Sequence, residues 1–289
     1  MTYNAYAKIN LTLDIVGKRD DGYHNISSVM QTISLCDKLT IDVSRNDGEK
    51  NSITVTSTDK DLPTDSKNLC YRACVLFFDK FAMQGINVRI HIEKNIPVGA
   101  GLGGGSSDCA ATLKALNKIF KLNATDETLE KIGGKIGSDV PFFIKGGCLK
   151  AEGTGDILSG PYSSGDVFIA LFMPKKMFFS GEIYKEFDDL FEKESSLFPK
   201  PSTDQFLSSK NRWKYGSNML AYVSEKRLEE ISIIKKKFIS LGAPAAEMSG
   251  SGPAVFAVFR TKKEAENALT ELKDHIPAGF CGVFKPIKL

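Results

Sequence analysis

The sequence lacks the patterns that mark zinc-binding, disulfide-rich and membrane-spanning proteins. Its six cysteines form no CxxC pair and its three histidines are scattered, so we assign no metal-ligating residue and expect reduced thiols in a cytoplasmic protein. No apolar run approaches the roughly 18 residues of a membrane span. Residues 1–10 lack the basic and apolar regions of a secretory signal. We therefore expect no membrane partner.

Charge of one sign does not dominate either. The 289 residues carry a formal net charge of +3, with 42% hydrophobic and 25% charged residues, which is ordinary globular composition. Basic runs are short, and Lys235-Lys236-Lys237 lies in a segment that is typical of a helix. A solvated helix face explains that run better than a nucleic-acid patch does. The length suits two modest domains.

Periodicity places several elements along the chain. Apolar residues alternate with polar ones over residues 9–15 and 88–92, which predicts half-buried strands. After a loop, the apolar spacing of residues 109–120 predicts a helix that begins near Ser106 or Ser107, with either serine as its cap and Asp108 in its first turn.

The end of the chain predicts a strand–helix–strand unit. A turn at Ser249–Pro253 leads into a buried strand over residues 254–259, and Thr261 and Glu264 have the spacing of a capping box. A helix over residues 265–272 and a last strand near residues 280–287 follow. Glycine and proline near residues 155–165 suggest a domain boundary there.

Residues 97–107, read as PVGAGLGGGSS, are the most informative segment, which we call the glycine loop. Five of its eleven residues are glycine. Glycine lets backbone N–H groups approach a polyphosphate closely, and the following helix adds partial positive charge at its N-terminus. No lysine precedes the serines, so the loop is not of the GxxxxGK[ST] type. The glycine spacing could also suggest a dinucleotide-binding fold. That fold would need a parallel α/β pattern and an acidic residue later in the chain, and neither is evident in this sequence. A glycine-rich turn without ligand is the remaining alternative to a phosphate-binding loop.

Several motifs together carry a family resemblance. The stretch PVGAGLGGGSSDCAA resembles the phosphate-binding signature of the GHMP kinases, the family of galacto-, homoserine, mevalonate and phosphomevalonate kinases, and Met248–Phe256 is similar to their C-terminal glycine-rich motif. Ala7–Leu11, Gly22-Tyr23-His24 and Gly137–Phe143 are similar to the members that phosphorylate 4-diphosphocytidyl-2-C-methyl-D-erythritol. Cys109 departs from the family, which commonly has alanine there.

The resemblance implies a two-domain α+β GHMP kinase fold. Residues 1–155 would form an N-terminal ATP-binding domain, and residues 156–289 a C-terminal ferredoxin-like α/β domain. The implied reaction transfers the γ-phosphate of ATP to the 2-hydroxyl of the cytidyl-diphospho-methylerythritol acceptor in non-mevalonate isoprenoid precursor biosynthesis. Mg²⁺ is expected to accompany ATP.

The resemblance also implies site residues. Asp139 would accept the hydroxyl proton, and Lys8 would be its cationic neighbour, favouring the developing charge. On spacing alone Asp139 could equally be a turn residue and Lys8 a solvent-facing strand residue. The residues implied to bind ATP are Asn68, Lys94, Pro97, Val98, Gly99, Ala100, Gly101, Leu102, Gly103, Gly104, Gly105, Ser106 and Ser107.

The acceptor site is implied to use Asn10, Tyr23, His24 and Tyr184. A cytosine ring has a flat face and a polar edge, so aromatic rings and an imidazole suit it. A core-capping tyrosine and a turn histidine are the structural alternatives. Two other functions stay open: another GHMP small-molecule kinase acting on homoserine, mevalonate or a sugar, and an inactive GHMP-fold binding protein.

Overall fold

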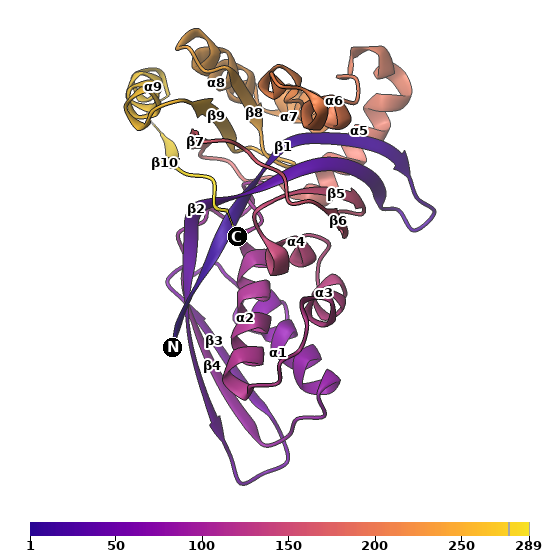
Figure 1. The fold of residues 1–289 in the computed structure, drawn as a ribbon, viewed down its shortest axis with the longest axis vertical. Helices are drawn as coiled ribbons and strands as arrows, with labels where there is room; N and C mark the ends of the chain where they lie inside the picture. The colour runs from indigo at the N-terminus through magenta and orange to yellow at the C-terminus, as the bar shows by residue number, and fades with distance from the viewer. Residues whose placement is uncertain (277, 289) are drawn as a thin grey trace. The chain divides into compact units, whose positions relative to one another are not determined.

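The computed structural model describes residues 1–276 and 278–288 and has the predicted α+β architecture (Figure 1). The chain divides into two compact units, which interleave along the sequence. The first unit comprises Met1–Ala7, Leu35–Ile96 and Gly103–Gly146; the second comprises Lys8–Ser34, Pro97–Leu102 and the chain from Gly147 onward. The continuous domains 1–155 and 156–289 stay a prediction, because each of the two units consists of several separate segments of the chain.

The strands and helices alternate irregularly along the chain. The strands are β1 (Thr2–Lys18), β2 (His24–Arg45), β3 (Ser52–Ser57), β4 (Ile86–Glu93), β5 (Cys148–Gly153), β6 (Ile157–Ser159), β7 (Phe168–Pro174), β8 (Ala245–Met248), β9 (Val255–Phe259) and β10 (Gly279–Phe284). The helices are α1 (Leu69–Lys80), α2 (Gly104–Phe120), α3 (Asp126–Gly134), α4 (Val140–Lys145), α5 (Ser180–Glu194), α6 (Thr203–Ser208), α7 (Met219–Arg227), α8 (Glu230–Ser240) and α9 (Lys262–His275). Short 3₁₀ turns, η1 (Ser195–Leu197) and η2 (Arg212–Tyr215), lie between α5 and α7.

The first unit packs helices against a mixed sheet. β4 pairs in parallel with β3 and antiparallel with residues 38–45 of β2. The helices α1 to α4 pack on one another, with α1 against α2, and their fully buried side chains include Phe77 and Leu113. α1, α2 and α3 each bury one apolar face in this way, which is the usual source of helix stability in a small domain, whereas α4 is buried nearly all round.

The second unit contains the predicted ferredoxin-like arrangement. Its strands β7 to β10 form an antiparallel sheet in the order β10-β7-β9-β8, with α8 and α9 packed on it (Figure 1). The chain order strand, helices, two strands, helix, strand is the one that defines this fold. Residues 26–31 of β2 pair with β5 in the same unit. The capping box predicted at Thr261 and Glu264 is present at the start of α9.

The first strand differs from its prediction in one respect. The alternating residues 9–15 do form a strand, but every residue from Ala7 to Ile15 is buried, the polar ones included. The prediction of a half-buried strand was therefore wrong. Periodicity reports which positions are apolar, and it cannot show that a second layer of protein covers the polar face.

The start of α2 also differs from its prediction. The helix begins at Gly104, and its N-cap is Gly103 in the left-handed conformation, with no side-chain cap. Neither Ser106 nor Ser107 caps it, and Asp108 lies beyond the first turn. Apolar spacing marks only the buried part of a helix, so the glycine-rich first turn was not visible in it.

The cysteines are all free thiols. Cys70, Cys74, Cys109 and Cys148 are buried, whereas Cys36 and Cys281 are partly exposed. Across the described part of the chain, no helix is long and apolar enough to cross a membrane. No group of three or more metal-ligating side chains occurs in residues 1–276 and 278–288.

Candidate active site

The glycine loop has the backbone of an anion-binding turn. Gly99, Gly101 and Gly103 have φ values of 64°, 77° and 70°, whereas Ala100 and Leu102 between them stay out of the left-handed region. Alternating conformations of this kind turn successive N–H groups toward a common concave side. Side chains other than glycine rarely adopt the left-handed conformation, so the three glycines make this backbone possible.

Other segments of the second unit bind the carbonyls of loop residues 99–102, which belong to the same unit. The carbonyls of residues 99, 100, 101 and 102 accept hydrogen bonds of 2.9 to 3.2 Å from Phe178 N, Ala254 N, Ser249 Oγ and Lys8 N respectively. In a trans peptide the following N–H points opposite to the carbonyl. The N–H groups of residues 100–103 therefore point away from the segments that hold the carbonyls, as a phosphate site requires.

The Ser249–Pro253 turn packs directly against this loop. A Cβ atom on Gly101 would lie 2.0 Å from the carbonyl oxygen of Ser249 and 3.0 Å from Gly252 N, and both are backbone atoms. Asn218, which is fully buried, holds the turn from the other side, because its Nδ2 donates to the carbonyls of Met248 and Gly250, each at 2.8 Å. Two glycine-rich segments, distant in sequence, thus form one rigid backbone assembly.

A row of polar side chains along β1 is buried in the second unit. Lys8 Nζ donates to Asn10 Oδ1 at 2.5 Å, and Asn10 Nδ2 donates to Ser28 Oγ at 2.8 Å. Lys8 and Asn10 are 4% and 2% exposed. Burying an ammonium group costs several kcal/mol unless it is paired, so this placement argues against the solvent-facing alternative for Lys8.

Asp139 belongs to the first unit. It is the residue before α4, half-buried, and its carboxylate makes no capping hydrogen bond to that helix, which has a proline in its first turn. Its assignment as a base stays a prediction.

The residues predicted to bind the acceptor differ in exposure. Tyr23 is 63% exposed, whereas His24 is 7% exposed and its ring lies 5.0 Å from that of Tyr184. His24 Nε2 is 2.6 Å from Asp188 Oδ1, and Lys18 Nζ pairs with the other carboxylate oxygen at 2.8 Å. Burial tends to raise the pKa of Asp188, but the hydrogen bonds from Lys18 and His24 outweigh it and lower that pKa. His24 and Tyr184 are thus brought together, with Asp188 as a charged anchor.

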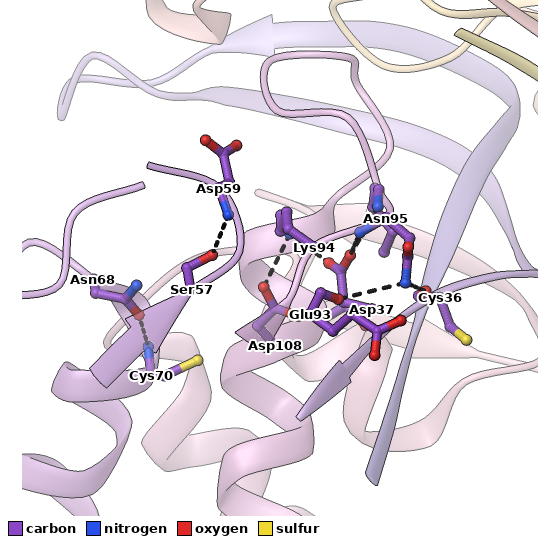
Figure 2. A network of polar contacts seen from close by, with 12 residues as sticks. Cys36, Asp37, Ser57, Asp59, Asn68, Cys70, Glu93, Lys94, Asn95 and Asp108 are labelled. Atoms are coloured by element: carbon purple, nitrogen blue, oxygen red, sulfur yellow. Dashed lines mark hydrogen bonds and ion pairs between the residues drawn. The ribbon is translucent and has the colours of Figure 1, made fainter. Parts of the chain in front are cut away.

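Three of the residues predicted to bind ATP, Asn68, Lys94 and Ser107, have structural partners in the first unit. Asn68 caps α1, accepting a hydrogen bond from Cys70 N at 2.8 Å and donating one to the carbonyl of Pro63. Lys94 is almost fully buried between Asp37 and Asp108 (Figure 2). Ser107 Oγ donates to the carbonyl of Tyr6 at 2.6 Å. Contacts of these residues with ATP stay predictions.

Comparison with known proteins identifies the family. Residues 68–147 match the model of the GHMP kinases N terminal domain, and residues 210–278 match that of the GHMP kinases C terminal. The 4-diphosphocytidyl-2-C-methyl-D-erythritol kinase of Clostridium beijerinckii is 40% identical over 278 residues, covering 94% of this chain and 96% of that protein. This chain belongs to the 4-diphosphocytidyl-2-C-methyl-D-erythritol kinase family of GHMP kinases.

Solved structures agree with this assignment of the kinase family. A crystal structure of 4-(cytidine 5'-diphospho)-2C-methyl-D-erythritol kinase superposes with a TM-score of 0.78 at 28% identity, covering 99% of both chains. A homoserine kinase from Cytophaga hutchinsonii gives a TM-score of 0.75 at 15% identity, covering 99% of this chain and 94% of that one. The latter likeness shows the shared GHMP fold alone.

Three residues of this kinase-family site were missed by sequence reasoning. Asn218 holds the Ser249–Pro253 turn, Asp188 anchors His24, and Asp37 completes the ion group around Lys94. Each acts on a partner at least 30 residues away along the chain. Spacing along the sequence carries no signal for such pairs, and the buried charge of Asp37 becomes visible only in the folded chain.

Proposed function

We propose that the chain transfers the γ-phosphate of ATP to the 2-hydroxyl of 4-diphosphocytidyl-2-C-methyl-D-erythritol, giving the 2-phosphate and ADP. The family membership supports the reaction, and the backbone of the glycine loop is the observation that carries it. A loop whose N–H groups 100–103 turn away from the protein segments that bind its carbonyls is suited to a polyphosphate. The product would be an isoprenoid precursor.

The proposed substrate is the magnesium complex of ATP. Mg²⁺ keeps several water ligands and binds mainly through phosphate oxygens, with one or two carboxylates at most. We assign no protein ligand to the ion.

In the proposed mechanism Asp139 accepts the proton of the acceptor hydroxyl as the oxygen attacks the γ-phosphorus and ADP leaves. Lys8 supplies positive charge for the phosphoryl group in transfer. These two roles rest on the family motifs. The burial of Lys8 beside Asn10 supports its part, because a buried ammonium has few of the rotamers of an exposed one and is held in place before the substrate binds.

The cytidine end of the acceptor is proposed to meet Tyr23, His24 and Tyr184. The exposed ring of Tyr23 offers a stacking face, and the His24–Tyr184 pair offers a second aromatic surface with a polar edge. The proposal also places the protein in the cytoplasm, where its six free thiols would remain reduced.

The test is ADP release with ATP, Mg²⁺ and the cytidyl-diphospho-methylerythritol acceptor. We expect turnover that depends on this acceptor and not on homoserine, mevalonate or sugars. Asp139→Asn should lower kcat by about 10²- to 10⁴-fold, the usual contribution of a general base. Asp42→Asn, at an exposed position of β2, is the matched control and should leave kcat unchanged.

Two results would overturn the proposal. Turnover of mevalonate, homoserine or a sugar in place of the cytidyl acceptor would move the chain to another GHMP activity. ATP binding without turnover of any acceptor would favour the inactive binding protein. Full activity of Asp139→Asn would remove the base from the mechanism while leaving the substrate assignment in place.

A further inference from the structure

Three buried charged side chains of the first unit hold the residues of that unit at the two ends of the glycine loop. Lys94 Nζ pairs with a carboxylate oxygen of Asp37 and lies 3.0 Å from Asp108 Oδ2 (Figure 2). The side chains of Lys94, Asp37 and Asp108 are 5%, 0% and 3% exposed. We call them the ion triad. Lys94 directly follows β4, Asp37 lies in β2 and Asp108 lies in α2.

The ion triad fixes the residues that enter the loop. Asp37 Oδ1 accepts hydrogen bonds from the backbone N–H groups of Asn95 and Ile96, at 2.6 and 2.8 Å. Ile96 is the residue directly before the loop. One carboxylate therefore binds the ammonium of Lys94 with one oxygen and the loop entrance with the other.

The same triad fixes the last part of the loop, where α2 begins. Lys94 Nζ lies 2.9 Å from the place where a Cβ atom of Gly104 would stand, so the ammonium packs directly on the first residue of α2. Asp108 draws the next turn of that helix to the same ammonium. Any displacement of Lys94 would consequently move both the entrance and the exit of the loop.

The charges of the triad do not balance when all three groups are ionised. One ammonium then faces two carboxylates, and an excess charge in a buried site is expensive. Asp108 Oδ1 also has no hydrogen-bond partner. Burial above all, and then the charge of Asp37, raise the pKa of Asp108 to about 8 against the opposing effect of Lys94. Burial opposes the charge on Lys94, but the two carboxylates outweigh it and raise the pKa of Lys94.

The other titratable groups near Asp108 add no charge to the site. Cys70 on α1 faces it, and Cys109 is its neighbour on α2. Burial raises the pKa of both thiols, so they stay neutral at physiological pH. The net charge of the site therefore depends on Lys94, on Asp37 and on whether Asp108 is protonated.

We propose that Asp37, Lys94 and Asp108 are positioning residues for the glycine loop, and that they hold it as a triad without net charge in which the two carboxyl groups share one proton. This inference rests on the proposed function, because it assigns the loop to ATP. Loss of the shared proton leaves two negative charges on one ammonium and loosens both loop ends. The ammonium of Lys94 acts on the loop backbone and not on the phosphates.

The first test is the pH dependence of KM for ATP in the wild type and in Asp108→Asn. The amide keeps the shape of the carboxyl group and can accept from Lys94, but it never ionises. One pH unit above the pKa of Asp108 only about a tenth of the protein retains the proton, so KM for ATP should rise about tenfold between pH 7 and 9 with little change in kcat. In Asp108→Asn that rise should disappear.

The second test probes the ion triad through the pH dependence of the Tm and needs no activity measurement. A carboxyl group whose pKa is raised in the folded state stabilises the protein fully below its unfolded pKa, near 3.8, and loses that contribution as the pH rises toward 8. The Tm of the wild type should therefore fall, relative to that of Asp108→Asn, between pH 5 and 8, and the difference should be constant above pH 9.

The outcomes separate this inference from the proposed function. The proposal of a shared proton would be wrong if the rise of KM for ATP at alkaline pH persisted in Asp108→Asn. It would also be wrong if the wild type and Asp108→Asn had parallel profiles of Tm against pH. An unchanged KM for ATP in Lys94→Met at pH 7 would overturn the positioning role. Absence of turnover in the wild type would remove the kinase reaction, yet the Tm profiles would still decide whether Asp108 holds a proton.

Discussion

The contact between the glycine loop and the Ser249–Pro253 turn gives the sharpest prediction, through Gly101→Ala. The added methyl group would stand 2.0 Å from the carbonyl oxygen of Ser249, and real Cβ atoms essentially never approach a heavy atom within 3.0 Å. The two backbones must therefore separate by about 1 Å at this point. Because the opposing atoms are backbone, no side-chain rotation relieves the contact.

The expected magnitude follows from two contributions. A left-handed conformation costs a residue with a side chain about 1–2 kcal/mol, and Gly101 has a φ of 77°. A displacement of about 1 Å in a substrate-positioning segment can lower activity by about 10²-fold. We therefore expect Gly101→Ala to lower kcat/KM for ATP by about 10²-fold and the Tm by several degrees.

Gly134→Ala is the matched control. This glycine lies in α3 without a positive φ, and its added methyl would meet only Pro141 Cγ at 3.8 Å, an ordinary contact. Alanine is the better helix former by about 1 kcal/mol, so the Tm should hold or rise. Steady-state kinetics and thermal unfolding of both variants make the test. A Gly101→Ala enzyme with wild-type kcat/KM would show that the glycine loop still functions when the Ser249–Pro253 turn has moved away from it. The reasoning from rigid packing would then be wrong.

Three further predictions concern stability and the acceptor. Asn218→Ala should cost about 2–4 kcal/mol in urea unfolding, because two buried carbonyls lose their donor, and a cost below 1 kcal/mol would contradict that. Thr261→Ala should cost about 1 kcal/mol through the lost capping box, and an unchanged Tm would count against it. Asp188→Asn should raise KM for the acceptor and leave KM for ATP unchanged, because it frees the His24 ring. The pKa of Asp188 is lowered in the fold, so its carboxylate stabilises the protein above pH 3.8 and that contribution is lost as the pH falls through the folded pKa; the variant should lack this acid sensitivity.

Local patterns in the sequence predicted local structure well. The strand over residues 9–15 and the capping box at Thr261 follow from spacing, and both are present in the structure. The ferredoxin-like sheet came from the family resemblance and is confirmed by its strand order. These features depend on neighbours within a few residues or on motifs that retain their sequence.

Long-range features could not be predicted in the same way. The polar face of β1 looked exposed because the layer that covers Lys8 and Asn10 comes from distant segments, such as the serine at position 249. Asp108 looked like a helix-dipole residue, yet its partners are Lys94 and Asp37, the latter 71 positions earlier in the chain. The sequence of a helix does not show whether solvent or an ammonium group faces one of its carboxylates.

The distribution of the thiols has a practical consequence. The thiolate is the reactive form, and burial raises the pKa of Cys109, beside the glycine loop, so a maleimide will not reach or attack it in the folded protein. The two partly exposed thiols are Cys36 in the first compact unit and Cys281 in the second. A thiol reagent will therefore label the native chain at Cys36 and Cys281 before it reaches any of the four buried thiols.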